Sequence, residues 1–323
     1  MTVRRPFAFV AVATVLVLAA CTTPAAIPTN SPTTSGPVTV ENCGVAVTFA
    51  TPPQRVITIK STSTEMMLAL GVGDRIVGTA YQDGPVPDEW ASGAAAIPVL
   101  ADKMPSEEVV LNAEPDLVYS GWESAFAPDA AGNRAELQSL GVATYVQPAA
   151  CQSADQPAKL SFDEIFREIA EAAKIFDVDP TALLEQQKTK LDAIHPASGN
   201  LTALWWSSGK DTPYVGAGIG APELLLETAG LTNIAGDINM TWSPLGWESI
   251  LAADPDVIVL VDASWNTAGH KIEYLTSNPA TANLTAVKNS RYIVIPFAAS
   301  EAGVRSVDAA ASIADQLKTL KLP

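Results

Sequence analysis

Two glutamates, Glu108 and Glu248, are the first residues whose spacing suggests chemistry. Each stands seven residues before a proline that begins a Pro-Asp pair, Pro115-Asp116 or Pro255-Asp256, and a hydrophobic strand follows. The copies are 140 residues apart, so each half of the chain carries one, and the period is too long for a solenoid. Carboxylates that act as a general acid and base must share one site, whereas these begin helices in separate halves. We therefore expect two lobes of similar build, each with a carboxylate in the same place.

A run of hydroxyl side chains beside a lysine, residues 60–64, follows the predicted strand 55–59 and precedes a predicted helix, 65–70. Hydroxyl and N–H groups at a helix start suit an anion. Capping of the helix by Ser63 or Thr64 is the alternative interpretation. The candidate ligand contacts in this run are Lys60, Ser61 and Thr62.

Aromatic residues gather at the ends of predicted strands, although only 7% of the chain is aromatic. Ligands of parallel sheets bind beyond the carboxyl ends of the strands. Such rings would hold a flat ring system by stacking, and an arginine there could pair with a carboxylate or phosphate. For any single tryptophan, half-buried packing is the alternative. The further candidate ligand contacts are Tyr81, Trp122, Glu123, Trp205, Trp206, Tyr214, Trp242, Trp265 and Arg305; Phe297 and Glu301 also follow the last predicted strand.

A glycine run, Gly216-x-Gly218-x-x-Ala221 with Asp237 further on, matches a loose dinucleotide fingerprint. The strand predicted before it has only two residues, so a glycine turn that approaches a ligand or another backbone fits better. A surface oxidoreductase built on this loop is the enzymatic alternative. Neither G-x-S-x-G, H-E-x-x-H nor a P-loop occurs, and two histidines in the whole chain do not suggest a metal site.

The elements that must position these residues alternate between strand and helix in both halves, which predicts mainly parallel sheets covered on both faces. We expect an α/β fold with two Rossmann-like βα lobes, residues 38–160 and 197–323, and a ligand cleft between them. A capping box at residues 161–164 and a proline at position 180 predict connecting helices across 161–196. A long helical connection is stiffer than a loop, so we expect modest hinge opening.

The chain of 323 residues is long enough for two domains, and its net charge of −16 disfavours nucleic acid as a partner. Arg4 and Arg5 precede an apolar stretch, 7–18, and then Leu-Ala-Ala-Cys21, which resembles a bacterial lipobox. We expect a signal peptide over 1–20, lipidation at Cys21 and a tether over 21–37. An ordinary signal peptide or an uncleaved anchor is the alternative.

Two further cysteines, Cys43 and Cys151, would meet an oxidising space in an exported protein, so a disulfide between them is expected, with free thiols as the alternative.

The lipobox, the tether, the two βα lobes, the helical connection and the paired glutamates together resemble the solute-binding lipoproteins of ABC importers. The resemblance covers about residues 38–320 and is nearest to the helix-linked class that serves siderophores, haem and cobalamin. It implies a non-enzymatic carrier without a cofactor, lipid-anchored at the extracytoplasmic face of the cell membrane. It also implies that Glu108 and Glu248 dock on a permease dimer, which works with cytoplasmic ATPases. We expect a monomer.

Five stretches, 59–65, 83–87, 119–124, 214–222 and 300–305, are similar to a branch of importers assigned to the deazaflavin precursor of coenzyme F-420. That resemblance implies a polar aromatic solute, with tryptophans on its ring and with Lys60 and Arg305 on its phosphate and carboxylate. A ferric siderophore, haem or corrinoid is the alternative solute. A ferric siderophore would more often meet several arginines or tyrosines, which the strand ends do not offer.

Overall fold

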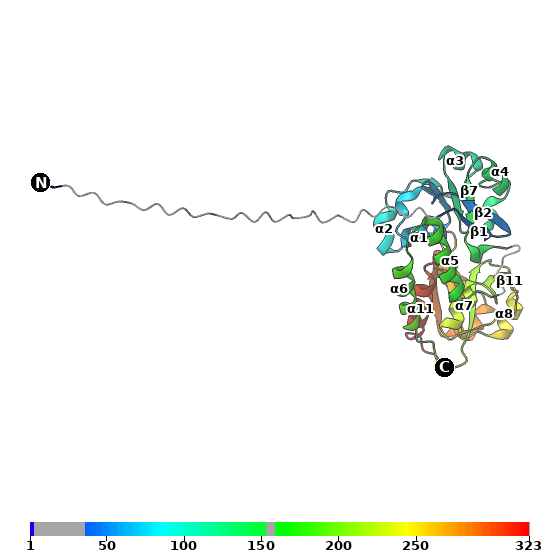
Figure 1. The fold of residues 1–323 in the computed structure, drawn as a ribbon. Helices are drawn as coiled ribbons and strands as arrows, with labels where there is room; N and C mark the ends of the chain where they lie inside the picture. The colour runs from blue at the N-terminus through cyan, green and yellow to red at the C-terminus, as the bar shows by residue number, and fades with distance from the viewer. Residues whose placement is uncertain (3–35, 153–158, 323) are drawn as a thin grey trace. The chain divides into compact units, whose positions relative to one another are not determined.

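The computed structural model describes residues 1–2, 36–152 and 159–322 (Figure 1). All but the first two residues of the predicted signal peptide, Cys21 and nearly all of the tether lie outside these residues. The described residues from 36 onward form one compact unit. Within the described part, no helix is both long and apolar enough to cross a bilayer.

The first lobe is built on five parallel strands in the order β5-β4-β3-β6-β7. Every residue of β3 is buried, as expected for a parallel strand covered on both faces. The strands are β3 (Val56–Ile59), β4 (Ile76–Ala80), β5 (Val99–Ala101), β6 (Leu117–Ser120) and β7 (Ala143–Val146); the helices are α1 (Ser61–Ala69), α2 (Asp88–Ala94), α3 (Glu107–Asn112) and α4 (Arg134–Ser139).

The second lobe repeats the parallel centre but adds antiparallel strands at one edge. Its order is β11-β9-β8-β12-β13, with β10 beside β8, and β9 runs antiparallel to both β8 and β11. The strands are β8 (Thr202–Ser208), β9 (Tyr214–Gly216), β10 (Thr232–Asn233), β11 (Trp242–Pro244), β12 (Val257–Asp262) and β13 (Tyr292–Pro296); the helices are α7 (Ala221–Thr228), α8 (Trp247–Ala253), α9 (Ala268–Ser277), α10 (Thr285–Lys288) and α11 (Ser306–Leu317). The predicted α/β fold with two sheets is confirmed.

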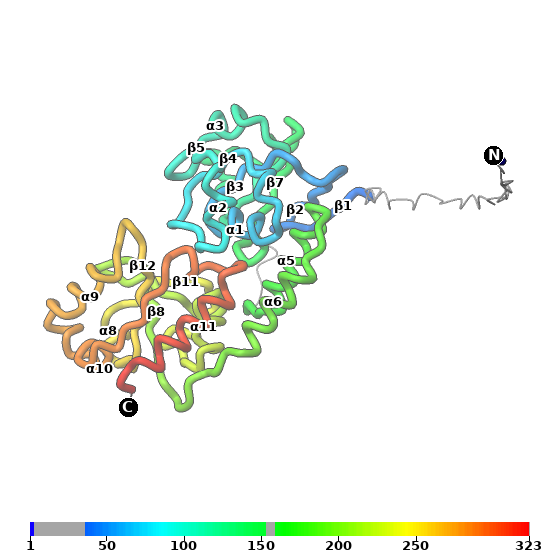
Figure 2. Tube along the Cα trace, turned by 90° about the vertical axis from the view of Figure 1, so that its left-hand side faces the viewer, coloured from blue at the N-terminus to red at the C-terminus, as the bar shows by residue number. Residues whose placement is uncertain are grey.

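Between the two sheets the chain forms two helices, α5 (Phe162–Phe176) and α6 (Thr181–Asp192), which run along one side of both lobes (Figure 2). The predicted capping box is present, because the Ser161 hydroxyl accepts from the Glu164 N–H and the Glu164 carboxylate accepts from the Ser161 N–H. The apolar face of α5 belongs to a hydrophobic cluster that also contains side chains of both sheets. The connecting helices are therefore packed on the lobes that they join.

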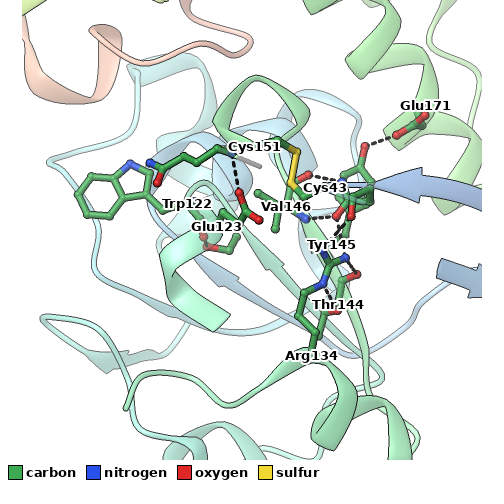
Figure 3. Close-up of a disulfide and its surroundings, with 12 residues drawn as sticks. Cys43, Trp122, Glu123, Arg134, Thr144, Tyr145, Val146, Cys151 and Glu171 are labelled. Carbon is green, nitrogen blue, oxygen red and sulfur yellow. Dashed lines mark hydrogen bonds between the residues drawn. A yellow bond between two sulfur atoms is a disulfide. The ribbon is translucent and has the colours of Figure 1, made fainter. Parts of the chain in front are cut away.

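The Cys43–Cys151 disulfide is formed and ties the beginning of the first lobe to its end (Figure 3). Cys43 stands in the turn of the hairpin formed by β1 (Val38–Asn42) and β2 (Val45–Phe49). The side chain of Asn42 docks this hairpin on β7, since its Nδ2 donates to the Val146 carbonyl (2.7 Å) and its Oδ1 accepts from the Val146 N–H (2.8 Å). The predicted pairing of the cysteines is confirmed.

The aspartate of the repeated Pro-Asp motif binds the neighbouring strand in both lobes. The carboxylate of Asp116 accepts the N–H groups of Gln54 (2.7 Å) and Arg55 (2.9 Å), just before β3. The carboxylate of Asp256 accepts the N–H of Thr202 (2.9 Å) at the start of β8. Each aspartate therefore ties the strand that it begins, β6 or β12, to the neighbouring strand of its sheet.

The helices that precede these aspartates also match. Each is followed by a residue with left-handed backbone directly before the proline, Glu114 (φ 48°) or Asp254 (φ 40°). Glu108 is the second residue of α3 and Glu248 the second residue of α8, and both are exposed. In Figure 1, α3 lies at the top of the first lobe and α8 at the lower right of the second. The paired glutamates thus occupy equivalent positions on two lobes.

Candidate functional site

A cavity of about 410 Å³ lies between the lobes, where the carboxyl ends of the parallel strands of both sheets face each other. Its wall is rich in rings that come from both lobes. Two of them, Tyr214 and Trp242, stack with ring centroids 6.2 Å apart, and Trp265 meets Phe297 edge to face at 5.8 Å. The aromatic lining residues are Trp122, Tyr214, Trp242, Trp265 and Phe297.

Of the twelve residues predicted to contact a ligand, five line this cavity: Thr62, Trp122, Tyr214, Trp242 and Trp265. Trp265 is the most open of them, with 62% of its surface exposed. Hydroxyl and amide side chains fill the wall between the rings, among them Ser124, Gln147, Gln152, Ser207, Thr241 and Ser300. A wall composed mostly of rings and neutral hydrogen-bonding groups is the usual composition of a small-molecule site.

Lys60 lies beneath the cavity floor rather than in the wall. Its side chain is 1% exposed and forms an ion pair with Asp83. The Nζ atom also stands 3.7 Å from the centroid of the Trp122 ring, 4.6 Å from that of Tyr81 and 4.9 Å from that of Phe297. The lysine predicted to meet an anion is therefore held by a carboxylate of the chain itself and by three aromatic faces.

The hydroxyl run, predicted as a loop before a helix, is the first turn of α1, which begins at Ser61. The Asp83 carboxylate accepts the Ser61 N–H (3.2 Å), and the Asp83 N–H donates to the Ser61 hydroxyl (2.9 Å). The Asp83 carboxylate thus binds both the N-terminus of α1 and Lys60. A side chain of the protein itself therefore occupies the expected anion site. Lys60 (φ 77°) and Tyr81 (φ 51°) hold left-handed backbone, a strain that such packed sites tolerate.

Arg305 is likewise engaged, across the cleft. Its guanidinium makes a two-pronged ion pair with Glu65 of α1 and donates to the Pro85 carbonyl (2.9 Å). The Glu65 side chain is 1% exposed, and burial raises its pKa to about 7 although Arg305 opposes the shift. The predicted anion-binding arginine instead links the second lobe to the first.

Glu301 is a functional candidate that the prediction did not select, although its place after the last strand was visible. It lines the cavity, and its Oε1 accepts the indole N–H of Trp122 from the other lobe (2.8 Å). Its Oε2 is buried without a hydrogen-bond partner among the described residues. Burial raises the pKa of Glu301 to about 7, with Lys60 opposing and Asp83 adding to the shift.

Two of the predicted tryptophans lie in the core rather than in the cavity wall. They were expected at the end of a strand, but β8 continues to Ser208, so Trp205 and Trp206 stand inside it with 0% and 2% exposed. Trp206 packs edge to face on Trp247 (5.3 Å between centroids), and its indole N–H donates to the Ser208 carbonyl (2.8 Å). These two tryptophans therefore pack in the core, which was the alternative to ligand contact.

Glu123 is not among the lining residues either, and its Oε2 accepts the Gln152 N–H (2.5 Å) next to the disulfide (Figure 3).

The glycine run is explained by close backbone approach. A Cβ atom on Gly218 would stand 1.9 Å from the Gly236 carbonyl oxygen, and one on Gly216 would stand 2.2 Å from Cβ of Pro222. The strand before the run, β9, is antiparallel to β8, whereas the dinucleotide fingerprint requires a parallel strand–turn–helix unit. This loop therefore does not have the geometry of a dinucleotide-binding turn.

Two mixed α/β lobes, a helical connection and a ring-lined cavity between the lobes define the class of two-lobed solute-binding proteins. The sequence agrees with this, since residues 56–299 match the model of the periplasmic binding protein family. The chain belongs to that family.

Known proteins are similar to the chain over most of its length. YvrC, an ABC transporter substrate-binding lipoprotein of Bacillus subtilis (strain 168), is 24% identical over 87% of this chain and 85% of its own. The cobalamin-binding protein of Halobacterium salinarum is 28% identical over 81% of this chain and 70% of its own.

Two solved structures show the same fold. A periplasmic binding protein from Veillonella parvula superposes with a TM-score of 0.77 at 25% identity, covering 90% of this chain and all of the other. A protein of an ABC-type Fe3+-hydroxamate transport system from Saccharomonospora viridis superposes with a TM-score of 0.73 at 28% identity, covering 87% of this chain and 99% of the other.

Proposed function

We propose that this protein is the extracytoplasmic solute-binding component of an ABC importer, a carrier rather than an enzyme. It captures a polar aromatic solute in the cleft and delivers it to a permease dimer that is driven by cytoplasmic ATPases. The observation that carries the proposal is the cavity between two lobes, with five rings in its wall and with one exposed glutamate at the equivalent place on each lobe. YvrC is named as a protein of this role.

The proposed division of the chain follows from the same role. Residues 1–20 direct export, Cys21 carries the lipid, and 21–37 tether the monomer to the cell membrane. Residues 38–160 and 197–323 form the two lobes, and the helices within 161–196 connect them.

The proposed solute is a flat ring system with hydroxyl or amide groups, such as the deazaflavin precursor of coenzyme F-420. Tryptophan and tyrosine rings from both lobes can stack on such a ring, and the amide and hydroxyl side chains of the wall can hydrogen-bond its polar arm. A corrinoid is the second candidate, because the cobalamin-binding protein of Halobacterium salinarum is similar over most of this chain. Mass spectrometry and absorbance of protein purified from its own host separate the two: a corrinoid spectrum would contradict the deazaflavin assignment.

Glu108 and Glu248 are proposed to dock on basic residues of the two permease subunits. Replacing both with alanine should abolish stimulation of the transporter ATPase in proteoliposomes, because each lobe then loses its exposed carboxylate. Solute affinity should stay within about twofold, since neither residue lines the cavity. The matched control replaces Glu136 and Glu273, exposed glutamates on other helices of the two lobes. Full stimulation by the Glu108→Ala/Glu248→Ala protein would contradict the docking assignment.

A further inference from the structure

The positive charges of the cleft are already neutralised by the chain. Lys60 is paired with Asp83 and enclosed by three rings, and Arg305 is paired with Glu65. Neither cation lines the cavity. An anionic solute would have to break a buried ion pair to reach either of them, and separating such a pair leaves an uncompensated buried charge.

The ionisable side chain that does line the cavity is acidic. Among the described lining residues, Glu301 is the one Asp, Glu, Lys, Arg or His. Its Oε1 is fixed by the indole N–H of Trp122, so its orientation is set by a contact between the lobes. Its Oε2 is left with an unused hydrogen-bonding capacity, which a buried polar atom seldom keeps in a native protein.

A second buried polar atom without a partner in the described structure, Oγ1 of Thr62, belongs to a lining residue of the first lobe. This oxygen packs closely against the backbone of Gly121, since a Cβ atom on that residue would stand 2.2 Å from it. Glu301 belongs to the second lobe, so the two unpartnered oxygens lie on lining residues of different lobes.

We propose that Glu301 determines the charge specificity of the cleft. Its Oε2 accepts a hydrogen bond from a donor group of the solute, a hydroxyl or an ammonium next to the aromatic ring, and the cleft discriminates against solutes with a carboxylate or phosphate at that place. This inference rests on the proposed solute-binding function and replaces the expectation that Lys60 and Arg305 hold an anionic group.

Affinity for an ammonium solute should depend on pH in a stated direction. The groups that face Glu301 are Lys60, Asp83 and the Trp122 indole, with the Glu65–Arg305 pair nearby. The pKa of Glu301 is about 7, so at lower pH the free protein holds a proton that the ammonium must displace. Affinity should therefore fall by up to about tenfold for each pH unit below about 7, and level off above it.

The test uses three naphthyl probes that differ in their terminal group: naphthylethylamine, naphthylethanol and naphthylacetate. Binding is followed by the NMR resonance of the Trp122 indole N–H, which reports even millimolar affinities. At about pH 8 the ammonium probe should bind at least about tenfold more tightly than the carboxylate probe, with the alcohol between them. In Glu301→Gln, this ratio should shrink to less than about threefold. The exposed-residue control Glu273→Gln should keep the full ratio.

Three results would overturn the inference. They are equal or tighter binding of the carboxylate, survival of the ammonium preference in Glu301→Gln, and no shift of the Trp122 resonance by any probe up to about 10 mM. Repeating the ammonium titration on the unaltered protein at about pH 6 gives a second reading that does not depend on how the variant folds. Failure of the importer role appears elsewhere, as no ATPase stimulation by the unaltered protein, and leaves the probe ratios unchanged.

Discussion

The first and second lobes are alike at their outer ends and different where they face the cleft. At the outer ends, each has a short helix with an exposed glutamate, one left-handed residue and a Pro-Asp step into a strand. At the cleft, the first lobe contributes buried charges, Lys60, Glu65 and Asp83, whereas the second contributes most of the rings together with Glu301 and Arg305. Because the outer ends of the two lobes are alike, they suit a partner made of two similar subunits. Because the cleft faces of the two lobes differ, they suit a solute with two different sides.

The disulfide makes the largest expected difference between the lobes. Cys43 and Cys151 close a loop with a sequence separation of 108 in the first lobe. Replacing both by alanine should lower the free energy of unfolding by about 4–5 kcal/mol in the chain-entropy account. Urea unfolding followed by circular dichroism, with and without reductant, measures it. An unchanged urea midpoint in the variant would show that the disulfide adds no stability to the first lobe.

The ion pair that joins the lobes comes next. Arg305→Met leaves Glu65 buried without its counter-ion and should cost about 3 kcal/mol at a pH above about 7, while Glu65→Gln/Arg305→Met should recover most of that cost. Thermal unfolding of the single and double variants measures the difference. The control is Lys190→Met, which removes an exposed pair with Asp308 and should cost less than about 1 kcal/mol. Equal losses in Arg305→Met and Lys190→Met would contradict a special role of the buried pair.

A buried carboxyl at the contact between α5 and the first sheet should make stability depend on pH. Glu168 accepts from the Gln147 amide, whose oxygen accepts from the Tyr119 hydroxyl (2.6 Å). Burial raises the pKa of Glu168 from 4.5 to about 8. Between these values the folded state binds more protons than the unfolded state, so the free energy of unfolding falls as pH rises.

Glu168→Gln should therefore be more stable than the unaltered protein by at least about 2 kcal/mol at a pH near 8 and should show a flatter pH profile. Urea midpoints across pH 5 to 8 measure the slope. The exposed residue Glu185 on α6 gives the control substitution, Glu185→Gln. A variant with the same pH slope as the unaltered protein would contradict the assignment of that slope to Glu168.

The smallest expected effect on stability belongs to the most exposed ring of the cavity. Trp265→Ala should change the free energy of unfolding by less than about 1 kcal/mol, yet weaken solute binding by about 1–3 kcal/mol if the ring stacks on the solute. Trp206→Ala should do the reverse, with a stability loss of about 3–5 kcal/mol, since Trp206 is a core residue. Thermal unfolding and a fluorescence titration measure both quantities. Binding that depends more on Trp206 than on Trp265 would contradict this division.

Structural features that depend on a local sequence pattern could be predicted. The Pro-Asp motif, the capping box at Ser161 and the alternation of strands and helices all lie within short stretches of chain, so their signals survive without knowledge of the fold. The rings at strand ends were predicted in part. Trp205 and Trp206 were misplaced because an apolar strand gives no periodic signal that marks its end.

The pairing of charges could not be predicted in the same way. Lys60 meets a carboxylate 23 residues later, and Glu65 meets an arginine 240 residues later. Such partners are brought together only by the packing of whole lobes, so the same lysine and arginine looked available for a solute. The unused oxygen of Glu301 is a property of its surroundings and has no sequence signature.

The Pro-Asp motif also has a mechanical consequence. In each lobe a central strand begins at this motif and ends beside a cavity tryptophan: β6 leads to Trp122, and β12 leads to the loop with Trp265. The strands have four and six residues, or about 13 and 20 Å. A strand held by neighbours on both sides stretches little. A force that moved α3 and α8 apart would thus be transmitted along β6 and β12 to Trp122 and Trp265 in the cavity wall.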